Sequence, residues 1–202
     1  EVFPNAVDLD KFSFNEIVRR RIRKESGLED KLVLGFVGRF ASQKNPEFLL
    51  KVLQEINKKY AHAQLVLLGQ GELEGRLRGR ARNLGLQNIT FMGRVDNVHE
   101  WMQAFDVLLL PSRFEGLGLV LIEGQASGLP CFASDRVPPE AAVTDRLTYL
   151  GLKDPAVWAD AILNADLSYD RSRGRSQTAA AGYDIRESAK RLEEIYDRLL
   201  SD

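Results

Sequence analysis

The chain has 202 residues, enough for one substantial domain with a buried core. Its 28 lysines and arginines nearly balance its 29 aspartates and glutamates, and the net charge of -1 argues against a nucleic-acid-binding protein whose affinity rests on bulk positive charge. The single Cys131 cannot form an internal disulfide, and no apolar run approaches the ~20 residues that span a bilayer, so we expect a cytoplasmic protein.

Residues 1–30 are predicted to form a linker-derived loop and a leading helix. Residues 1–12 lack an initiating Met and indicate a loop already in progress, so we expect a piece of a longer protein. A helix is predicted at 14–27, and it carries the basic run RRRIRK (19–24). Acidic neighbours dilute this charge, which favours a solvated helix face; the alternative is peripheral association with the inner face of a membrane.

Residues 31–165 alternate short apolar runs with helical stretches, the pattern of an α/β domain. Strands are predicted at 31–38, 63–69, 88–93, 106–112, 129–134 and 147–152, and helices at 45–60, 71–85, 97–105 and 117–128. Asn45 is placed to cap the first of these helices, with Pro46 at its first position. Strands that are apolar on both faces and separated by helices predict a Rossmann-like, doubly wound parallel sheet.

Residues 166–202 are predicted to form a flexible segment and a closing helix. Residues 166–182 are polar and small, the composition of a mobile connection. Residues 185–200 have the periodicity of an amphipathic helix.

Three glycines after the second strand imitate a dinucleotide-binding fingerprint. Gly69, Gly71 and Gly75 lie between a strand and a helix, but the third glycine comes one residue late for G-x-G-x-x-G. The spacing therefore favours a plain strand-to-helix turn over a nicotinamide site, with the edge of another ligand pocket as a minority alternative.

The loop after the first strand, GRFASQKN, places a glycine and two cations together. In a doubly wound sheet, ligands bind at the carboxyl ends of the strands where the strand order reverses, usually beside the first and fourth strands. Gly38 allows a ligand to approach the backbone, while Arg39 and Lys44 supply positive charge for an anion. On residue type alone, a solvated basic loop is equally expected.

The fourth strand is followed by PSRFEGLGLVLIEGQ, which sets two glutamates into an apolar run. A helix is predicted to begin near Leu117, after Gly116, and its open N–H groups would bind a phosphate. Glu115 would face hydroxyl groups beside that phosphate. Glu123 lies about 12 Å further along the helix, so one ligand with polyol groups at both ends satisfies both carboxylates. A nucleotide-sugar has this form; an exposed helix residue is the alternative for Glu123.

The remaining polar residues give weaker signals. Arg94 and Val95 follow the third strand and are predicted either to line a base pocket or to form a surface turn. His62 and His99 have no companions at metal-ligand spacing, and no D-x-D triplet is present to hold a metal diphosphate. The sequence therefore predicts neither a metal nor a cofactor.

These motifs resemble a known family. GRFASQKN and PSRFEGLGLVLIEGQASGLP together are similar to the carboxyl-terminal domain of retaining glycosyltransferases with two Rossmann-like domains (the GT-B fold, family 4), marked by Glu, seven residues, Glu. The resemblance runs from about residue 2 to residue 165. Residues 133–162 resemble the branch that makes bacterial capsular polysaccharide and exopolysaccharide.

The resemblance implies roles for individual residues. Arg39 and Lys44 would hold the donor diphosphate and, with Glu115, carry the catalysis. The donor sugar and phosphate would be met by Glu115, Gly116, Leu117 and Gly118, the ribose by Glu123, and the base by Arg94 and Val95. Gly38 would also belong to the donor site, where it lets the ligand approach the backbone. Transfer would retain the anomeric configuration, without a metal, and we expect a UDP-linked donor.

The resemblance also implies a partner domain. Family members carry an amino-terminal domain that binds the acceptor, here expected to be a saccharide or a lipid-linked saccharide, and the present chain lacks it. We therefore expect the chain alone to bind nucleotide weakly and to transfer nothing. Two alternatives stay open: a non-catalytic nucleotide-binding or scaffolding module, and a nucleotide-sugar 2-epimerase domain.

Overall fold

The computed structural model describes residues 5–201 and contains a six-stranded, all-parallel sheet. The strands are β1 (Leu32–Val37), β2 (Ala63–Leu68), β3 (Ile89–Gly93), β4 (Val107–Leu110), β5 (Cys131–Ser134) and β6 (Leu147–Leu150), in the order β3-β2-β1-β4-β5-β6. The strand order reverses between β1 and β4, which pair at Leu34↔Val107 and Gly35↔Leu108. The predicted doubly wound sheet is confirmed.

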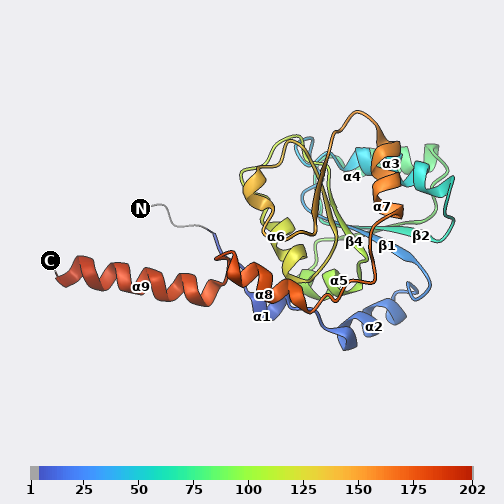
Figure 1. The fold of residues 1–202 in the computed structure, drawn as a ribbon. Coiled ribbons are helices and arrows are strands. Elements are labelled where there is room, and N and C mark those ends of the chain that lie inside the picture. The colour runs from blue at the N-terminus through green and yellow to red at the C-terminus, as the bar shows by residue number, and fades with distance from the viewer. Residues whose placement is uncertain (1–4, 202) are drawn as a thin grey trace.

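Helices cover both faces of this sheet (Figure 1). On one face lie α3 (Pro46–Asn57), α4 (Glu74–Asn83) and α7 (Pro155–Leu163), with α3 packed on α7. The other face carries α2 (Glu16–Glu25), α5 (Val98–Ala104) and α6 (Leu119–Ala126). The short α1 (Leu9–Phe12) and α8 (Arg173–Ala180) pack against α6, whereas α9 (Ile185–Ser201) extends away from the rest.

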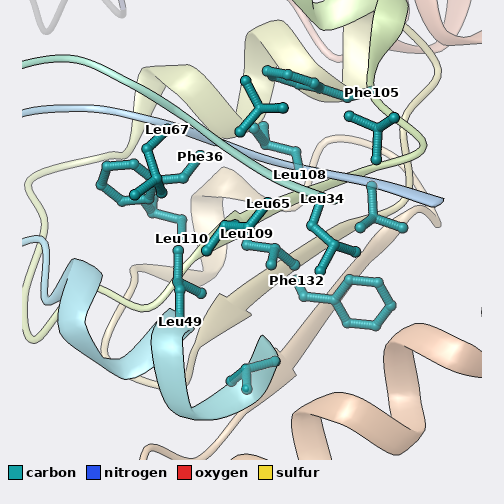
Figure 2. Close-up of a cluster of buried hydrophobic side chains, with 14 of the residues drawn as sticks. Leu34, Phe36, Leu49, Leu65, Leu67, Phe105, Leu108, Leu109, Leu110 and Phe132 are labelled. Atoms are coloured by element: carbon teal, nitrogen blue, oxygen red, sulfur yellow. The ribbon is translucent and has the colours of Figure 1, made fainter. Parts of the chain in front are cut away.

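The core lies between the sheet and its helices and is built from the strands themselves. Figure 2 shows Leu34, Phe36, Leu65, Leu67 and the β4 leucines packed together, with Leu49 contributed by α3. Gly35 makes room for the ring of Phe105, because a Cβ atom at Gly35 would lie 2.1 Å from that ring. Close packing where β1 and β4 lie side by side fixes the position of their carboxyl ends.

The basic run 19–24 contributes a buried ionic clamp as well as exposed charge. Arg19 and Arg23 contact the carboxylate of Asp106 at 2.5 and 3.0 Å, and the Val33 N–H donates to the same carboxylate at 2.7 Å. Asp106 is only 12% exposed. Arg20 pairs with Glu16 on the surface. Part of the run therefore anchors α2 to the sheet. The sequence had predicted either a solvated helix face or a membrane contact, and not this anchor.

Two local details differ from the predictions. Asn45 stands before α3, and Pro46 is its first residue, but Asn45 adopts a left-handed conformation with φ of 51° and its side chain makes no capping bond. Helix α6 begins at Leu119 rather than near Leu117, because Gly118 is left-handed with φ of 80°. Residues 1–4 of the predicted leading loop lie outside the described residues.

The segment 166–182, predicted to be flexible, contains helix α8 docked on α6. Arg171 donates hydrogen bonds to four backbone carbonyls, those of Met102, Gln103, Phe105 and Ser127. Gly128 and Gly174 allow the two backbones to touch, since a Cβ at Gly128 would lie 2.2 Å from the Arg171 carbonyl oxygen. These contacts offset the conformational entropy that the segment loses when it is ordered. The composition alone had predicted a mobile segment because it does not reveal these contacts.

The clamp at Asp106 gives a stability prediction. Asp106→Ala leaves two largely buried guanidinium groups and one backbone N–H without their acceptor, so we expect the free energy of unfolding to fall by about 3 kcal/mol. Urea unfolding measures this change. The control is Asp160→Ala, which removes a surface pair with Lys59 and should cost about 0.5 kcal/mol. Equal losses in the two variants would contradict a clamp at Asp106.

Candidate functional site

Two adjoining hollows open at the carboxyl ends of β1, β2, β3 and β4. They share Val37, Gly38 and Val98, and their volumes are about 710 and 430 Å³. The larger, the β2–β3 hollow, is also lined by Arg39, Leu68, Gly69, Gln70, Gly71, Glu74, Arg94 and Val95. The smaller, the α6 hollow, is also lined by Asn5, Phe12, Lys44, Glu115, Leu117, Gly118, Leu119, Val120 and Glu123.

An ion pair joins the loops that follow β1 and β4. The Lys44 ammonium lies 2.7 Å from Glu115 Oε1, and the Ser112 hydroxyl donates to the same oxygen at 2.5 Å. The Glu115 side chain is 6% exposed and that of Lys44 is 21% exposed. The pair therefore holds a cation at the wall of the α6 hollow, where the remaining donors of the ammonium are free to bind an anion.

The start of α6 supplies further donors to the same hollow. Gly118 precedes the helix and has no side chain to cap it. Within the described residues, the N–H groups of Leu119 and Val120 have no acceptor, whereas the Leu121 N–H donates to the Gly118 carbonyl at 2.8 Å. Open N–H groups and the positive end of a helix dipole attract anionic oxygen.

Glu123 carries the one strongly perturbed carboxylate in this hollow. Burial raises the pKa of Glu123 to about 7, and the nearby Lys11 ammonium only partly opposes that rise. Among the described residues, no hydrogen bond or ion pair reaches the Glu123 carboxylate. A half-buried acid without a partner is costly, so its surroundings are suited to a ligand that brings hydroxyl donors.

The other predicted residues divide between the two hollows. Gly38 lies in both, while Arg39, Arg94 and Val95 line the β2–β3 hollow. The Arg39 side chain is 74% exposed and pairs with Glu72 at 3.2 Å, so it stands at the rim, apart from Lys44. Gly116 is exposed and lines neither hollow. The structure thus gathers nine of the ten predicted residues at one sheet edge.

The glycines that imitate a dinucleotide fingerprint have a packing role here. Gly69 has a φ of 137°, and a Cβ at this position would lie 1.9 Å from the Gly38 carbonyl oxygen. At Gly71 a Cβ would lie 2.5 Å from the Phe40 carbonyl oxygen. Both glycines therefore let the β2 turn touch the β1 loop and form the floor of the β2–β3 hollow, in keeping with a turn at a pocket edge.

Several lining residues had no predicted role in the site, among them Val98, which lines both hollows, and Asn5 and Phe12. Asn5 and Phe12 reach the α6 hollow from the segment that leads into α2. The Phe12 carbonyl accepts a hydrogen bond from the Ser127 hydroxyl at 2.7 Å, which ties this segment to the end of α6. The contact joins residues far apart in the chain, so no local spacing signals it.

The described residues include no group of three or more His, Cys, Asp and Glu side chains that could hold a metal ion. In the same part of the chain, no helix is long and apolar enough to cross a membrane. The cations among the residues that line these two hollows are Arg39, Lys44 and Arg94, and they can attract an anionic ligand.

A family model supports these observations. The model described as Glycosyl transferases group 1 matches residues 31–165, which include the whole sheet and nearly all of the residues that line both hollows.

Two curated relatives are similar to this chain. A Bacillus subtilis strain 168 protein named as a glycosyltransferase, EpsF, is 36% identical over 202 residues, covering 97% of this chain and 53% of that protein. An Escherichia coli protein named UDP-Gal:alpha-D-GlcNAc-diphosphoundecaprenol alpha-1,3-galactosyltransferase is 33% identical over 141 residues, covering 66% of this chain and 36% of that protein. The chain spans about half the length of these relatives, or less.

A solved structure shares the fold. The crystal structure of Anabaena HepE in complex with UDP and glucose superposes with a TM-score of 0.83 at 18% identity, covering 98% of this chain and 56% of that chain.

The raised pKa of Glu123 gives a prediction on stability. The folded chain binds a proton at Glu123 more tightly than the unfolded chain does. The resulting contribution to the free energy of unfolding is complete below about pH 4.5 and is lost as the pH rises through about 7. We expect Glu123→Gln to gain about 2 kcal/mol in unfolding free energy, relative to the unsubstituted chain, between pH 5 and pH 8. Urea unfolding at several pH values tests this.

The matched control is Glu29→Gln, which changes an exposed glutamate in the loop before β1. Because its side chain is exposed, we expect this substitution to change the unfolding free energy by less than about 0.5 kcal/mol. A pH-independent difference for Glu123→Gln would show that the Glu123 carboxyl is not perturbed by burial.

Proposed function

The chain belongs to the group 1 glycosyl transferases, and we propose that it forms the donor-binding half of a retaining, family 4 enzyme of the GT-B fold. The proposed donor is a nucleotide-sugar. The observation that carries this proposal is the unpartnered Glu123 carboxylate, placed in the same hollow as the Lys44–Glu115 pair and the open start of α6. One hollow thus offers acceptors for hydroxyl groups and donors for phosphate.

The diphosphate of the donor would bind where positive charge is fixed before the ligand arrives. This position is lined by Leu119, Val120 and Lys44, which supply two backbone N–H groups and an ammonium. The exposed Arg39 side chain would reach it by changing its rotamer. When the bond between the sugar C1 and the phosphate oxygen breaks, its electron pair stays on the diphosphate. Lys44 and Arg39 would stabilise that growing charge without a metal, which is electrostatic catalysis.

The hydroxyl groups of the donor would satisfy the two glutamates. Glu115 retains one carboxylate oxygen that neither Lys44 nor Ser112 contacts, and this oxygen can accept from the donor sugar. Glu123 would accept from the ribose hydroxyls. The base would then lie in the β2–β3 hollow beside Arg94 and Val95. The donor would therefore span both hollows, with its base in the β2–β3 hollow and its ribose, diphosphate and sugar in the α6 hollow.

The names of similar proteins support a UDP-linked donor and a lipid-linked acceptor. The Anabaena structure holds UDP and glucose, and the name of the E. coli relative specifies UDP-galactose and a lipid-linked acceptor. Together with the resemblance of residues 133–162 to the capsular branch, this favours transfer to a saccharide or lipid-linked saccharide at the cytoplasmic face of a membrane. The acceptor would be held by the rest of the protein, because this chain spans only about half of its relatives.

Nucleotide titration tests the donor site. In metal-free calorimetry with UDP, GDP, ADP and CDP, we expect UDP to bind most tightly. Lys44→Ala and Glu123→Gln should each weaken UDP binding about tenfold, because each removes from the protein a group that would hydrogen-bond to the ligand. The controls Lys58→Ala and Glu29→Gln change exposed residues outside both hollows and should leave affinity unchanged.

Two results would contradict the proposal. Unchanged UDP affinity in both cleft variants would place the nucleotide elsewhere. Turnover of a UDP-sugar by this chain alone would show that the remaining half of the protein is not needed for transfer. A nucleotide-binding module without catalysis would pass the titration, so the longer protein must also transfer sugar, and its Lys44→Ala variant must lose that activity.

A further inference from the structure

A third hollow lies at the carboxyl ends of β5 and β6, at the same sheet edge as the donor cleft. Its volume is about 580 Å³. The lining includes Arg113, which follows β4, Arg136, which follows β5, and Lys153, which follows β6. Leu152 and Val157 form an apolar part of the wall. The residues assigned above to the donor lie outside this β5–β6 hollow.

Positive charge in the β5–β6 hollow is in excess and partly uncommitted. Three cations line it against two carboxylates, Asp135 and Asp154. Asp154 accepts the Ala156 N–H at 2.8 Å as the cap of α7, and Asp135 lies 3.5 Å from its neighbour Arg136. Within the described residues, the side chains of Arg113 and Lys153 have no hydrogen bond or ion pair. Two free cations at a concave surface favour an anionic ligand.

The backbone that presents Arg113 is fixed to the donor cleft. The Arg113 N–H donates to the Gln43 carbonyl at 2.7 Å, and the Gln43 side-chain amide donates to the Phe114 carbonyl at 3.2 Å. Glu115 follows directly and pairs with Lys44 in the α6 hollow. Residues 113–115 therefore form a wall with the β5–β6 hollow on one side and the donor site on the other.

We propose that the β5–β6 hollow is a second phosphate site, which holds a phosphate or diphosphate group of the acceptor. A guanidinium group binds phosphate through two parallel hydrogen bonds, and Lys153 adds a point charge. Leu152 and Val157 can cover an apolar part of the same molecule. The assignment to the acceptor rests on the proposed transferase function, whereas the anion site itself rests on this hollow alone.

Pyrophosphate is the probe for this site, and glucose 1-phosphate distinguishes a monophosphate from a diphosphate. The isotope-labelled chain is saturated with UDP, and each probe is then added while backbone amide shifts are followed. We expect pyrophosphate to shift the amides of residues 151–154 and Arg113. Arg113→Gln with Lys153→Gln should weaken this binding at least about tenfold, and added salt should weaken it further.

The control variant, Lys58→Gln with Arg82→Gln, removes the same charge from the residue that follows α3 and from α4, and it should leave pyrophosphate binding unchanged. Absence of shifts at 151–154, or an equal loss in both double variants, would overturn the proposal, because the charge would then be only a solvated rim. The shifts are read residue by residue, so failure of UDP to bind at residues 118–120 would count against the donor site and not against this one.

Discussion

The reversal of strand order between β1 and β4 is the constraint on which the site depends. The chain leaves β1 for α3 on one face and leaves β4 for α6 on the other, so no helix covers the edge between them. Packing of Phe105 on Gly35 sets the spacing of these strands. The Lys44–Glu115 pair then joins the two departing loops at the candidate site.

The candidate site retains groups that the fold itself does not satisfy. Glu123 is held half-buried without a partner, and the first N–H groups of α6 lack acceptors among the described residues. Both features cost stability, whereas Asp106 and Arg171, the buried charges that join distant segments, each have several partners. The Glu123 carboxylate and the first N–H groups of α6 are therefore in position before a ligand binds. Among the described residues, the side chains of Arg113 and Lys153 in the β5–β6 hollow likewise have no hydrogen-bond or ion-pair partner.

Local patterns predicted the sheet and most of the site, because both follow from short-range periodicity and from the rule that ligands gather at strand ends. Gly38, Lys44, Glu115 and Glu123 could be found in this way. The clamp at Asp106, the approach of Phe12 to α6 and the docking of α8 could not, since each joins residues that are far apart in the chain. The start of α6 moved by two residues because Gly118 adopts a left-handed conformation that sequence periodicity does not reveal.

One ligand is proposed to join the open start of α6 to Glu123, and a crystal structure of this chain grown with UDP tests this directly. We expect diphosphate oxygens within hydrogen-bond distance of the Leu119 and Val120 N–H groups, and ribose hydroxyls on the Glu123 carboxylate. UDP bound elsewhere, or bound in the cleft without a contact to Glu123, would show that these groups do not form the nucleotide site.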